Sequence, residues 1–325
     1  MRKREIQMAL CLTSYKRVED LQRQMACMLR QSYGSFHLFV AVKGVPEAVV
    51  TQVILPGFAR DIASGRLTVH LFPNKNQLSN LIDTVRGLPI DDYDLFLKID
   101  DDDLYGIDYL HKVAEFHQTL PPGCCSCYEG PCPVLEKRHG FPLMGERFFR
   151  VFGSSFVWTR PVMERIFACE QSPSLAAEIL ARNASPFDNG NIGFAEDNLI
   201  HLLMKENGCA NIAPYLKQKG IDPHIIVQNS NASVTRGGLL DDRFAEANKT
   251  LSTDPALWEH CIAVSRNGFE ADVVVITGTC GYLLREREQV AVRTFDGGQL
   301  SIARSDGSIE RFTKQKDGTF VLDTK

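Results

Sequence analysis

The chain has 325 residues, of which 44% are hydrophobic and 23% are charged, and its formal net charge is −4. This is an ordinary globular composition with enough apolar residues for a sizeable core, and the acidic balance gives no sign of nucleic-acid binding. No apolar stretch approaches the roughly 18 residues of a membrane span, and the run at 6–12 is too short for a signal peptide. The length predicts one large domain with a smaller one, or two of moderate size.

Strand-like and helix-like patterns alternate over the first part of the chain. Short apolar runs predict buried strands, and apolar residues at helical spacing predict helices between them. This alternation predicts an α/β fold with a doubly wound, mostly parallel sheet. The expected strands cover 6–13, 36–42, 67–72 and 95–99, and the expected helices cover 18–31, 76–88 and 106–118, with a mixed segment at 46–59 that is expected to be helical as far as Pro56.

The middle of the chain is less regular. The segment 121–145 is rich in proline, glycine and cysteine, and it predicts a loop or an edge hairpin. A strand is expected at 148–158 and a polar loop at 183–193. Helices are expected at 161–168, 176–182 and 199–207, the last of them ended by Gly208.

The sequence pattern changes from about residue 271 onward. Short β-rich runs alternate with turns that contain Asp-Gly, and such turns predict hairpins. We therefore expect a small C-terminal antiparallel β domain at 271–325, after a main domain at 1–265, with the boundary near 262–271. Its role stays open between a closed barrel, docking on the main domain and a homo-oligomer contact. The expected strands are 272–277, 289–294, 300–304, 309–312 and 319–322.

Four of the ten cysteines, Cys124, Cys125, Cys127 and Cys132, lie close together in the sequence. The Cys124-x-x-Cys127 spacing suits half of a zinc site, but no matching pair follows at a familiar distance, although His139 is near. We expect reduced thiols. Without a secretory signal a disulfide framework is not expected.

Four consecutive aspartates, Asp100 to Asp103, directly follow the apolar run at 95–99. Like charges this close repel one another unless a cation lies among them. Mg²⁺ and Mn²⁺ prefer hard oxygen ligands, and a strand end is where open α/β sheets bind their ligands. The run therefore predicts a cation site, with a solvated acidic loop as the alternative.

Two further segments complete a pattern. Thr13-Ser14-Tyr15-Lys16-Arg17 follows the first expected strand, and Glu196-Asp197 opens the helix at 199–207. An acidic pair at a helix start also matches the helix dipole, which is a common structural role. Taken in this order over about residues 6–235, the three segments resemble the family 2 glycosyltransferases of GT-A fold. Those enzymes have Thr-x-Tyr-Asn/Lys-Arg, Asp-x-Asp-Asp (the DxD motif) and Glu-Asp at the corresponding places.

The resemblance implies a metal-dependent inverting transfer of a sugar from a nucleoside-diphosphate sugar donor to a glycan or glycolipid hydroxyl. It implies Mn²⁺ or Mg²⁺ as the cofactor, with Asp102 as the direct ligand, Asp100 in the ribose contact or the metal shell, and His224 as a candidate third ligand. Asp197 is the implied base, and Glu196 orients the acceptor. The implied nucleotide-sugar contacts are Thr13, Tyr15, Arg17, Asn80, Asp100 and Asp101.

The chain also departs from that family. The Asp-Asp-Gly-Ser segment after the second strand is absent, so a uracil base is not implied. Lys43 at this place is expected to be an exposed turn residue, with a polar contact in place of the missing Asp as the alternative. Trp158 is expected to lie in the core. His201 follows Asp197 by one helical turn, so it is a residue that could approach the site.

Two other classes of function remain open from the sequence. A nucleotidyltransferase also places aspartates at a strand end, but it needs a glycine-rich loop after the first strand, which 13–16 lacks. A non-catalytic nucleotide- or glycan-binding module is the third class. We expect a cytoplasmic protein, with a peripheral contact at the inner face of the membrane as an option because Arg2, Lys3 and Arg4 are basic.

Overall fold

The computed structural model describes most of the chain up to residue 219 and separate strands beyond it. The described residues are 4–73, 75, 77–106, 108–136, 143–149, 153–182, 196–219, 225–229, 274–277, 280–283, 288–295, 299–303, 309–314 and 320–322. The chain forms two compact units: the first comprises Met1–Asp101, Ile107–Glu129 and Arg150–Gly220, and the second Asp102–Gly106, Gly130–Phe149 and Ile221–Lys325. The boundary predicted near 262–271 lies outside the described residues and stays a prediction.

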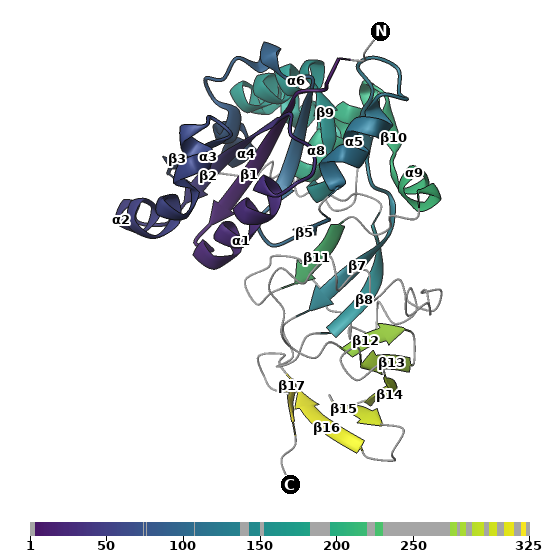
Figure 1. The fold of residues 1–325 in the computed structure, drawn as a ribbon. Helices are drawn as coiled ribbons and strands as arrows, with labels where there is room; N and C mark the ends of the chain where they lie inside the picture. Colours follow the sequence, from purple (N-terminus) through teal and green to yellow (C-terminus); the bar gives the residue numbers. More distant parts are fainter. Residues whose placement is uncertain are drawn as a thin grey trace. The chain divides into compact units, whose positions relative to one another are not determined.

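A seven-stranded sheet forms the centre of the first unit, as far as the chain is described (Figure 1). Its strand order is β10-β6-β9-β4-β1-β2-β3. Neighbours from β4 to β3 are parallel, β10 is parallel to β6, and β9 is antiparallel to both of its neighbours. The predicted α/β class with a mostly parallel sheet is confirmed. The strands are β1 (Met8–Tyr15), β2 (Phe36–Lys43), β3 (Leu67–Phe72), β4 (Leu95–Asp100), β6 (Cys125–Cys127), β9 (Val157–Thr159) and β10 (Cys209–Asn211).

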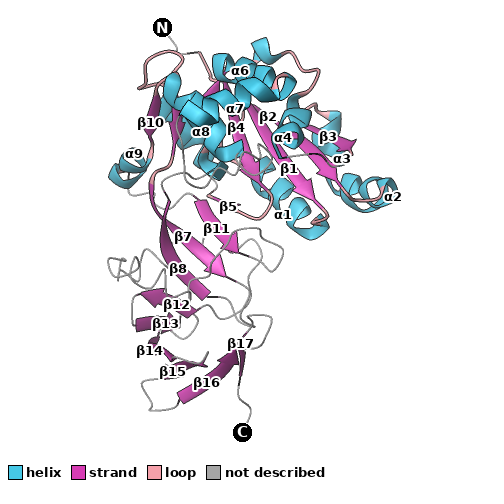
Figure 2. Ribbon diagram, turned by 180° about the vertical axis from the view of Figure 1, so that it is seen from behind, coloured by secondary structure: helices cyan, strands magenta, loops and turns pink. Residues whose placement is uncertain are grey.

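The central strands are mostly apolar because helices cover both faces of the sheet. In β1, Met8 to Leu12 are fully buried, and Leu10 pairs with Leu38 of β2 and Leu97 of β4. Figure 2 views the face covered by α4, α6, α7 and α8, whereas α1 and α5 lie on the opposite face. These helices are α1 (Val18–Leu29), α4 (Gln77–Val85), α5 (Tyr109–His117), α6 (Arg160–Gln171), α7 (Pro173–Arg182) and α8 (Glu196–Glu206).

The predicted helices are confirmed, with two differences nearby in the chain. The mixed segment continues past Pro56, through α2 (Glu47–Val49), a π turn and a 3₁₀ turn, to α3 (Ala59–Ala63). Pro56 lies in the first turn of the 3₁₀ segment, where its missing N–H breaks no hydrogen bond. The prediction of a single strand at 148–158 is wrong. A 3₁₀ turn at Gly153–Ser155 separates β8 (Leu143–Phe149) from β9.

Within the residues described for the second unit, ten strands form one sheet in the order β17-β16-β15-β14-β13-β12-β8-β7-β11-β5. Its strands from β12 to β17 pair antiparallel with their sequence neighbours, which confirms the predicted meander. One strand, β13, was not expected. β7 and β8 pair antiparallel as a hairpin. Of the two structures predicted for 121–145, a loop or an edge hairpin, this is the second. The strands are β5 (Leu104–Tyr105), β7 (Gly130–Glu136), β8, β11 (Ile225–Asn229), β12 (Val274–Thr277), β13 (Cys280–Leu283), β14 (Glu288–Phe295), β15 (Gln299–Ala303), β16 (Ile309–Lys314) and β17 (Phe320–Leu322).

A short helix, α9 (Ala213–Gln218), follows β10. Within the residues that the structure describes, no helix combines the length and the apolar character needed to cross a lipid bilayer.

Candidate functional site

The centre of the first unit has a topological switch point at β1. After β1 the chain forms β2 and β3 on one side, and it then returns to place β4 on the other side. Open α/β sheets bind ligands outside the carboxyl ends of the strands at such a point. The register pairs Thr13 of β1 with Asp100 of β4, so two of the three predicted motifs lie side by side here.

An ion pair joins the two segments that follow these strands. Arg17 Nη1 lies 2.8 Å from Asp101 Oδ1, and both side chains are largely buried. Arg17 precedes α1, and Asp101 directly follows β4. Since the pair is charge-assisted and mostly shielded from water, it fixes both segments relative to each other. Two predicted nucleotide-sugar contacts therefore bind each other in this structure.

Tyr15 ends β1 with its ring 45% exposed, so it is open to a ligand at this edge of the sheet. The turn beside it is tight: Lys16 and Gly44 both have positive φ angles, and the Lys16 amide donates to the Lys43 carbonyl. A β-carbon on Gly44 would lie 2.7 Å from the Tyr15 ring. Glycine at residue 44 is therefore required both by its φ angle and by the close approach of that ring.

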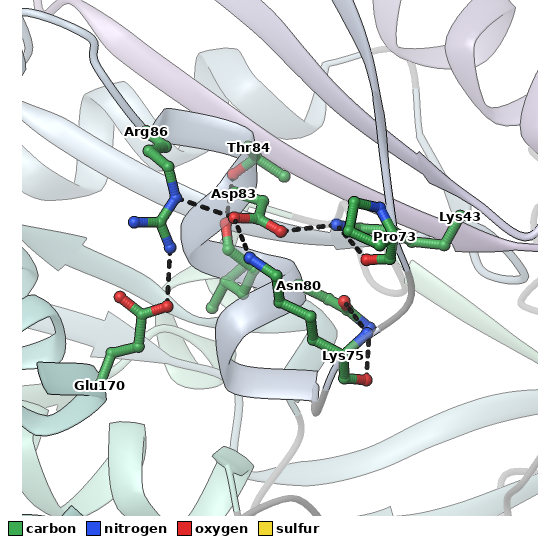
Figure 3. A network of polar contacts seen from close by, with 9 residues as sticks. Lys43, Pro73, Lys75, Asn80, Asp83, Thr84, Arg86 and Glu170 are labelled. Atoms are coloured by element: carbon green, nitrogen blue, oxygen red, sulfur yellow. Dashed lines mark hydrogen bonds and ion pairs between the residues drawn. The ribbon is translucent and has the colours of Figure 1, made fainter.

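Asn80 lies in the first turn of α4, and its side chain binds the segment that precedes this helix. Its Oδ1 accepts from the Lys75 amide at 3.1 Å, and its Nδ2 donates to the Lys75 carbonyl at 3.3 Å (Figure 3). These two bonds hold the connection between β3 and α4. The structure therefore gives Asn80 a structural role, and its predicted contact to the nucleotide stays a prediction.

Lys98 of β4 connects the end of β4 with the start of α8. Its Nζ lies 2.8 Å from Asp197 Oδ1, 3.4 Å from Asp100 Oδ1 and 3.8 Å from Glu196 Oε1. Lys98 and Asp197 are 99 positions apart in the sequence. One ammonium group therefore brings together carboxylates of two predicted motifs, the aspartate run and the Glu-Asp pair.

The three carboxylates and the lysine have unequal access to water. The Lys98 and Glu196 side chains are 9% and 6% exposed, whereas Asp197 is 40% exposed. Burial would lower the pKa of Lys98, but Asp100, Asp197 and Glu196 outweigh it and hold this pKa well above its usual value. Burial raises the pKa of Glu196 to about 7, and Asp197 adds to this rise while Lys98 opposes it. The shifts favour a charged Lys98 at neutral pH and make Glu196 easier to protonate than an exposed glutamate.

The 3₁₀ turn at Gly153–Ser155 completes this group. Ser154 Oγ donates to Asp100 Oδ2 at 2.6 Å, so both Asp100 oxygens have polar neighbours from the protein. Gly153 lies directly against Asp197: a β-carbon on this glycine would lie 2.6 Å from the Asp197 Cγ. The Asp197 carboxylate can occupy its position only because residue 153 has no side chain.

Sequence reasoning missed Lys98, Ser154 and Gly153. For Lys98 a signal existed, because a charged residue in the apolar run Leu97-Lys98-Ile99 must find buried partners. Nothing in the sequence marks Ser154 or Gly153, since only the folded chain brings them to Asp100 and Asp197.

The predicted metal ligands are only partly described. Asp102 is half-buried and Asp103 is almost fully buried, whereas His224 lies outside the described residues. Carboxylate oxygens are the donors that Mn²⁺ and Mg²⁺ prefer, so the chemistry of Asp100 and Asp102 fits such a cation. The set of Asp102, Asp100 and His224 stays a prediction.

Lys43 is not the exposed turn residue that the sequence suggested. Its side chain is 1% exposed, and its Nζ lies 2.6 Å from Asp83 Oδ2 (Figure 3). The same Nζ lies 4.4 Å from the centre of the Phe72 ring. Asp83 also binds Lys75 and Arg86. Lys43 is buried because α4 covers the end of β2, and a cation there must bind a buried carboxylate.

Two further expectations concern single residues. Trp158 is fully buried in the apolar cluster beneath α6 and α8, as expected. His201 does not approach the Lys98 group through any contact that the structure records among the described side chains. Its ring stacks on Phe156, and its Nε2 lies near Cys127 and Glu129.

A cavity of about 610 Å³ lies in the same unit, between the amino end of β4 and α6. Its lining includes Asp94, Leu95 and Arg160. Because ligands of open α/β sheets bind at carboxyl ends, we place the candidate site at Asp100 instead.

No family model matches the chain, and no curated protein sequence matches it. Among solved structures, it is similar to the mannosyltransferase PcManGT from Pyrobaculum calidifontis, in complex with GDP-Man and Mn²⁺, at 10% identity and a TM-score of 0.38, covering 50% of this chain and 47% of that one. It is also similar to the glycosyltransferase GlyE of Streptococcus pneumoniae TIGR4, at 9% identity and a TM-score of 0.40, covering 81% and 63% of the two chains.

A third similar structure is TarS 1-349 of S. aureus in complex with UDP, at 11% identity and a TM-score of 0.40, with 79% of this chain and 71% of that chain covered. The chain thus spans less than two thirds of the length of the first two structures. TM-scores of 0.38 to 0.40 do not assign an activity to this chain.

Proposed function

We propose that the protein is a metal-dependent inverting glycosyltransferase of the GT-A type. It would move a sugar from a nucleoside-diphosphate sugar to a hydroxyl group of a glycan or glycolipid. The observation that supports this most directly is the Lys98 group, because it joins the aspartate run after β4 with the Glu-Asp pair that opens α8. Sugar transfer needs a site for the diphosphate and a base for the acceptor within one active site.

Asp197 is the proposed base. It is the most exposed carboxylate of the Lys98 group, so an incoming hydroxyl can reach it. As the acceptor oxygen attacks the sugar, its proton passes to Asp197 and the bond to the diphosphate breaks. Lys98 and Gly153 fix the position of this carboxylate. Glu196 is buried against Lys98, which favours a positioning role over the direct contact with the acceptor that the resemblance implied.

The proposed donor site lies at the carboxyl ends of β1 and β4. There Thr13 pairs with Asp100, Arg17 binds Asp101, and Tyr15 ends β1. Asp102 and Asp100, with His224, would hold a Mn²⁺ or Mg²⁺ ion, which when bound would neutralise the charge that builds on the diphosphate. A cytoplasmic location, a peripheral membrane contact and a homo-oligomer all stay predictions.

A nucleotidyltransferase is less well supported. Such an enzyme cradles phosphates with the backbone of a glycine-rich loop after the first strand. The connection from β1 to α1 contains Tyr15, Lys16 and Arg17 and no glycine. Its left-handed residue is Lys16 rather than a glycine.

The first experiment is a thermal-shift screen of nucleoside-diphosphate sugars with and without Mn²⁺. A donor bound only to the native state at 100 times its Kd stabilises the protein by about 2.7 kcal/mol, which is readily visible as a higher Tm. We expect one nucleotide class to raise the Tm in the presence of the metal, and slow release of free nucleoside diphosphate in the same samples. Binding without any turnover, also with acceptors added, would favour the non-catalytic module.

A second experiment replaces Gly153 with alanine. The added methyl group would occupy the position of the Asp197 carboxylate and push this exposed side chain away from Lys98. We expect a loss of transfer activity of at least about tenfold, because displacing a catalytic group costs rate, with little change in Tm. Gly34→Ala is the matched control, since a β-carbon there meets no atom within 4 Å. Full activity of Gly153→Ala would contradict the proposed position of Asp197.

A further inference from the structure

A second group of chemically active side chains lies at another edge of the first unit, away from the Lys98 contacts. Cys127 is on β6, Glu129 follows this strand, and His201 is on α8. Their ligand atoms lie within 4.8 Å of one another. Cys127 Sγ lies 4.0 Å from His201 Nε2 and 3.9 Å from Glu129 Oε1, and these two atoms are 3.6 Å apart.

These three distances suit a metal ion. One central point is equidistant from the three atoms at about 2.2 Å, and zinc lies about 2.0 to 2.3 Å from its oxygen, nitrogen and sulfur ligands. An ion at this point would need only small movements of the side chains. The geometry is therefore already close to that of a coordination site.

Cys209 of β10 lies beside this group but outside it. Its Sγ donates to Cys127 Sγ at 3.5 Å, whereas the ligand atoms that lie within range of one another are those of Cys127, Glu129 and His201. The sequence motif Cys124-x-x-Cys127 thus contributes only Cys127 to the group.

The surrounding structure holds these side chains in place. The Asn211 side chain of β10 binds both the amide and the carbonyl of Glu129, at 3.1 and 2.9 Å. Phe156 stacks on the His201 ring. Cys127 and His201 are buried, and Glu129 is 38% exposed, which leaves a path for an ion from solvent.

We propose that Cys127, His201 and Glu129 bind a structural zinc ion. Sulfur and imidazole ligands favour zinc, whereas the all-oxygen ligands of the aspartate run favour Mn²⁺ or Mg²⁺. The two sites would therefore select different ions. The zinc ion would join the end of β6 to α8, and it would hold the helix whose first turn carries Asp197.

The test uses the full chain, purified under reducing conditions, freed of metal with a chelator and titrated with Zn²⁺ or Co²⁺. We expect one tightly bound zinc ion per chain, a higher Tm with zinc, and a thiolate-to-metal absorption band with cobalt. Carboxylates alone give no such band, so the aspartate run cannot produce it. The result is independent of sugar transfer, so a failure here leaves the proposed activity untouched.

Variants separate this site from the sequence motif. Cys127→Ser and Glu129→Gln should each weaken zinc binding at least about tenfold, since even residues behind the ligands cost about 10- to 100-fold. Glu129→Gln is the variant expected to fold in any case, because its side chain is partly exposed. Cys124→Ser is the matched control, because this thiol donates to the Gly208 carbonyl and lies outside the group.

Three results would overturn the proposal. They are a missing thiolate band, equal loss of zinc in Cys124→Ser and Cys127→Ser, and a Cys127–Cys209 disulfide by mass spectrometry together with no zinc binding by the reduced protein.

Discussion

Replacing Asp197 with asparagine is expected to lower sugar transfer by about 100- to 10,000-fold, the usual contribution of a general base. The amide has the same size but cannot accept the proton of the acceptor hydroxyl. Lys98 keeps Asp100 and Glu196 as partners, so the variant should fold. Metal-dependent binding of the nucleotide should be almost unchanged, because the donor contacts lie at the ends of β1 and β4. Initial rates and thermal shifts measure the two properties separately.

Asp91→Asn is the control for this variant. Asp91 also pairs with a basic residue, Arg160, but both side chains are far more exposed, so its loss should alter neither activity nor stability noticeably. If Asp197→Asn lost nucleotide binding and transfer to the same degree, Asp197 would be a structural residue and the proposed mechanism would fail.

Replacing Asp83 with asparagine is expected to destabilise the protein by about 3 to 5 kcal/mol, because it leaves a buried cation without its counter-charge. Lys43 and Asp83 are fully buried, at 2.6 Å. Without Asp83, Lys43 would keep, among the described residues, the Pro73 carbonyl at 3.4 Å (Figure 3) and the Phe72 ring. Denaturant unfolding measures the change.

Two comparisons test the cause of this loss. Glu206→Gln removes one half of the exposed Arg165–Glu206 pair and should cost less than about 1 kcal/mol. The double variant Lys43→Met, Asp83→Asn should lose less than the sum of the single variants, because it removes the buried charge with its partner. Additive losses would contradict a direct pairing.

The effect of Asp83→Asn should also depend on pH. Burial alone would raise the pKa of Asp83, but hydrogen bonds from Lys43 and Arg86 outweigh it and hold the pKa below its usual value. The charged form therefore stabilises the native state at every pH above the usual value for Asp, about 3.9, and this contribution is lost as the pH falls through the lowered value. The difference between wild type and Asp83→Asn should shrink in strong acid.

The order and kind of most elements could be predicted from the sequence, because they depend on local patterns. The apolar run at Met8–Leu12 predicts a strand that helices cover on both faces, and the Asp-Gly turns of the tail predict the meander. The same reasoning placed the aspartate run at a strand end. The prediction of one strand over 148–158 was wrong. The turn at Gly153–Ser155 interrupts it, and only the folded chain shows that this turn places Gly153 against Asp197 and Ser154 against Asp100.

The amino-acid sequence predicts which chemical groups are present: an acidic run after a strand, an acidic pair at a helix start, and clustered thiols. Which of these groups contact one another follows only from the folded chain. Lys98 binds Asp197, which is 99 positions away in the sequence, and Lys43 binds Asp83, which is 40 positions away. Cys127 contacts His201, which is 74 positions away. The reason is that side-chain spacing predicts neighbours only within one helix or strand, whereas these contacts depend on how strands are ordered in the sheet and which helix covers them.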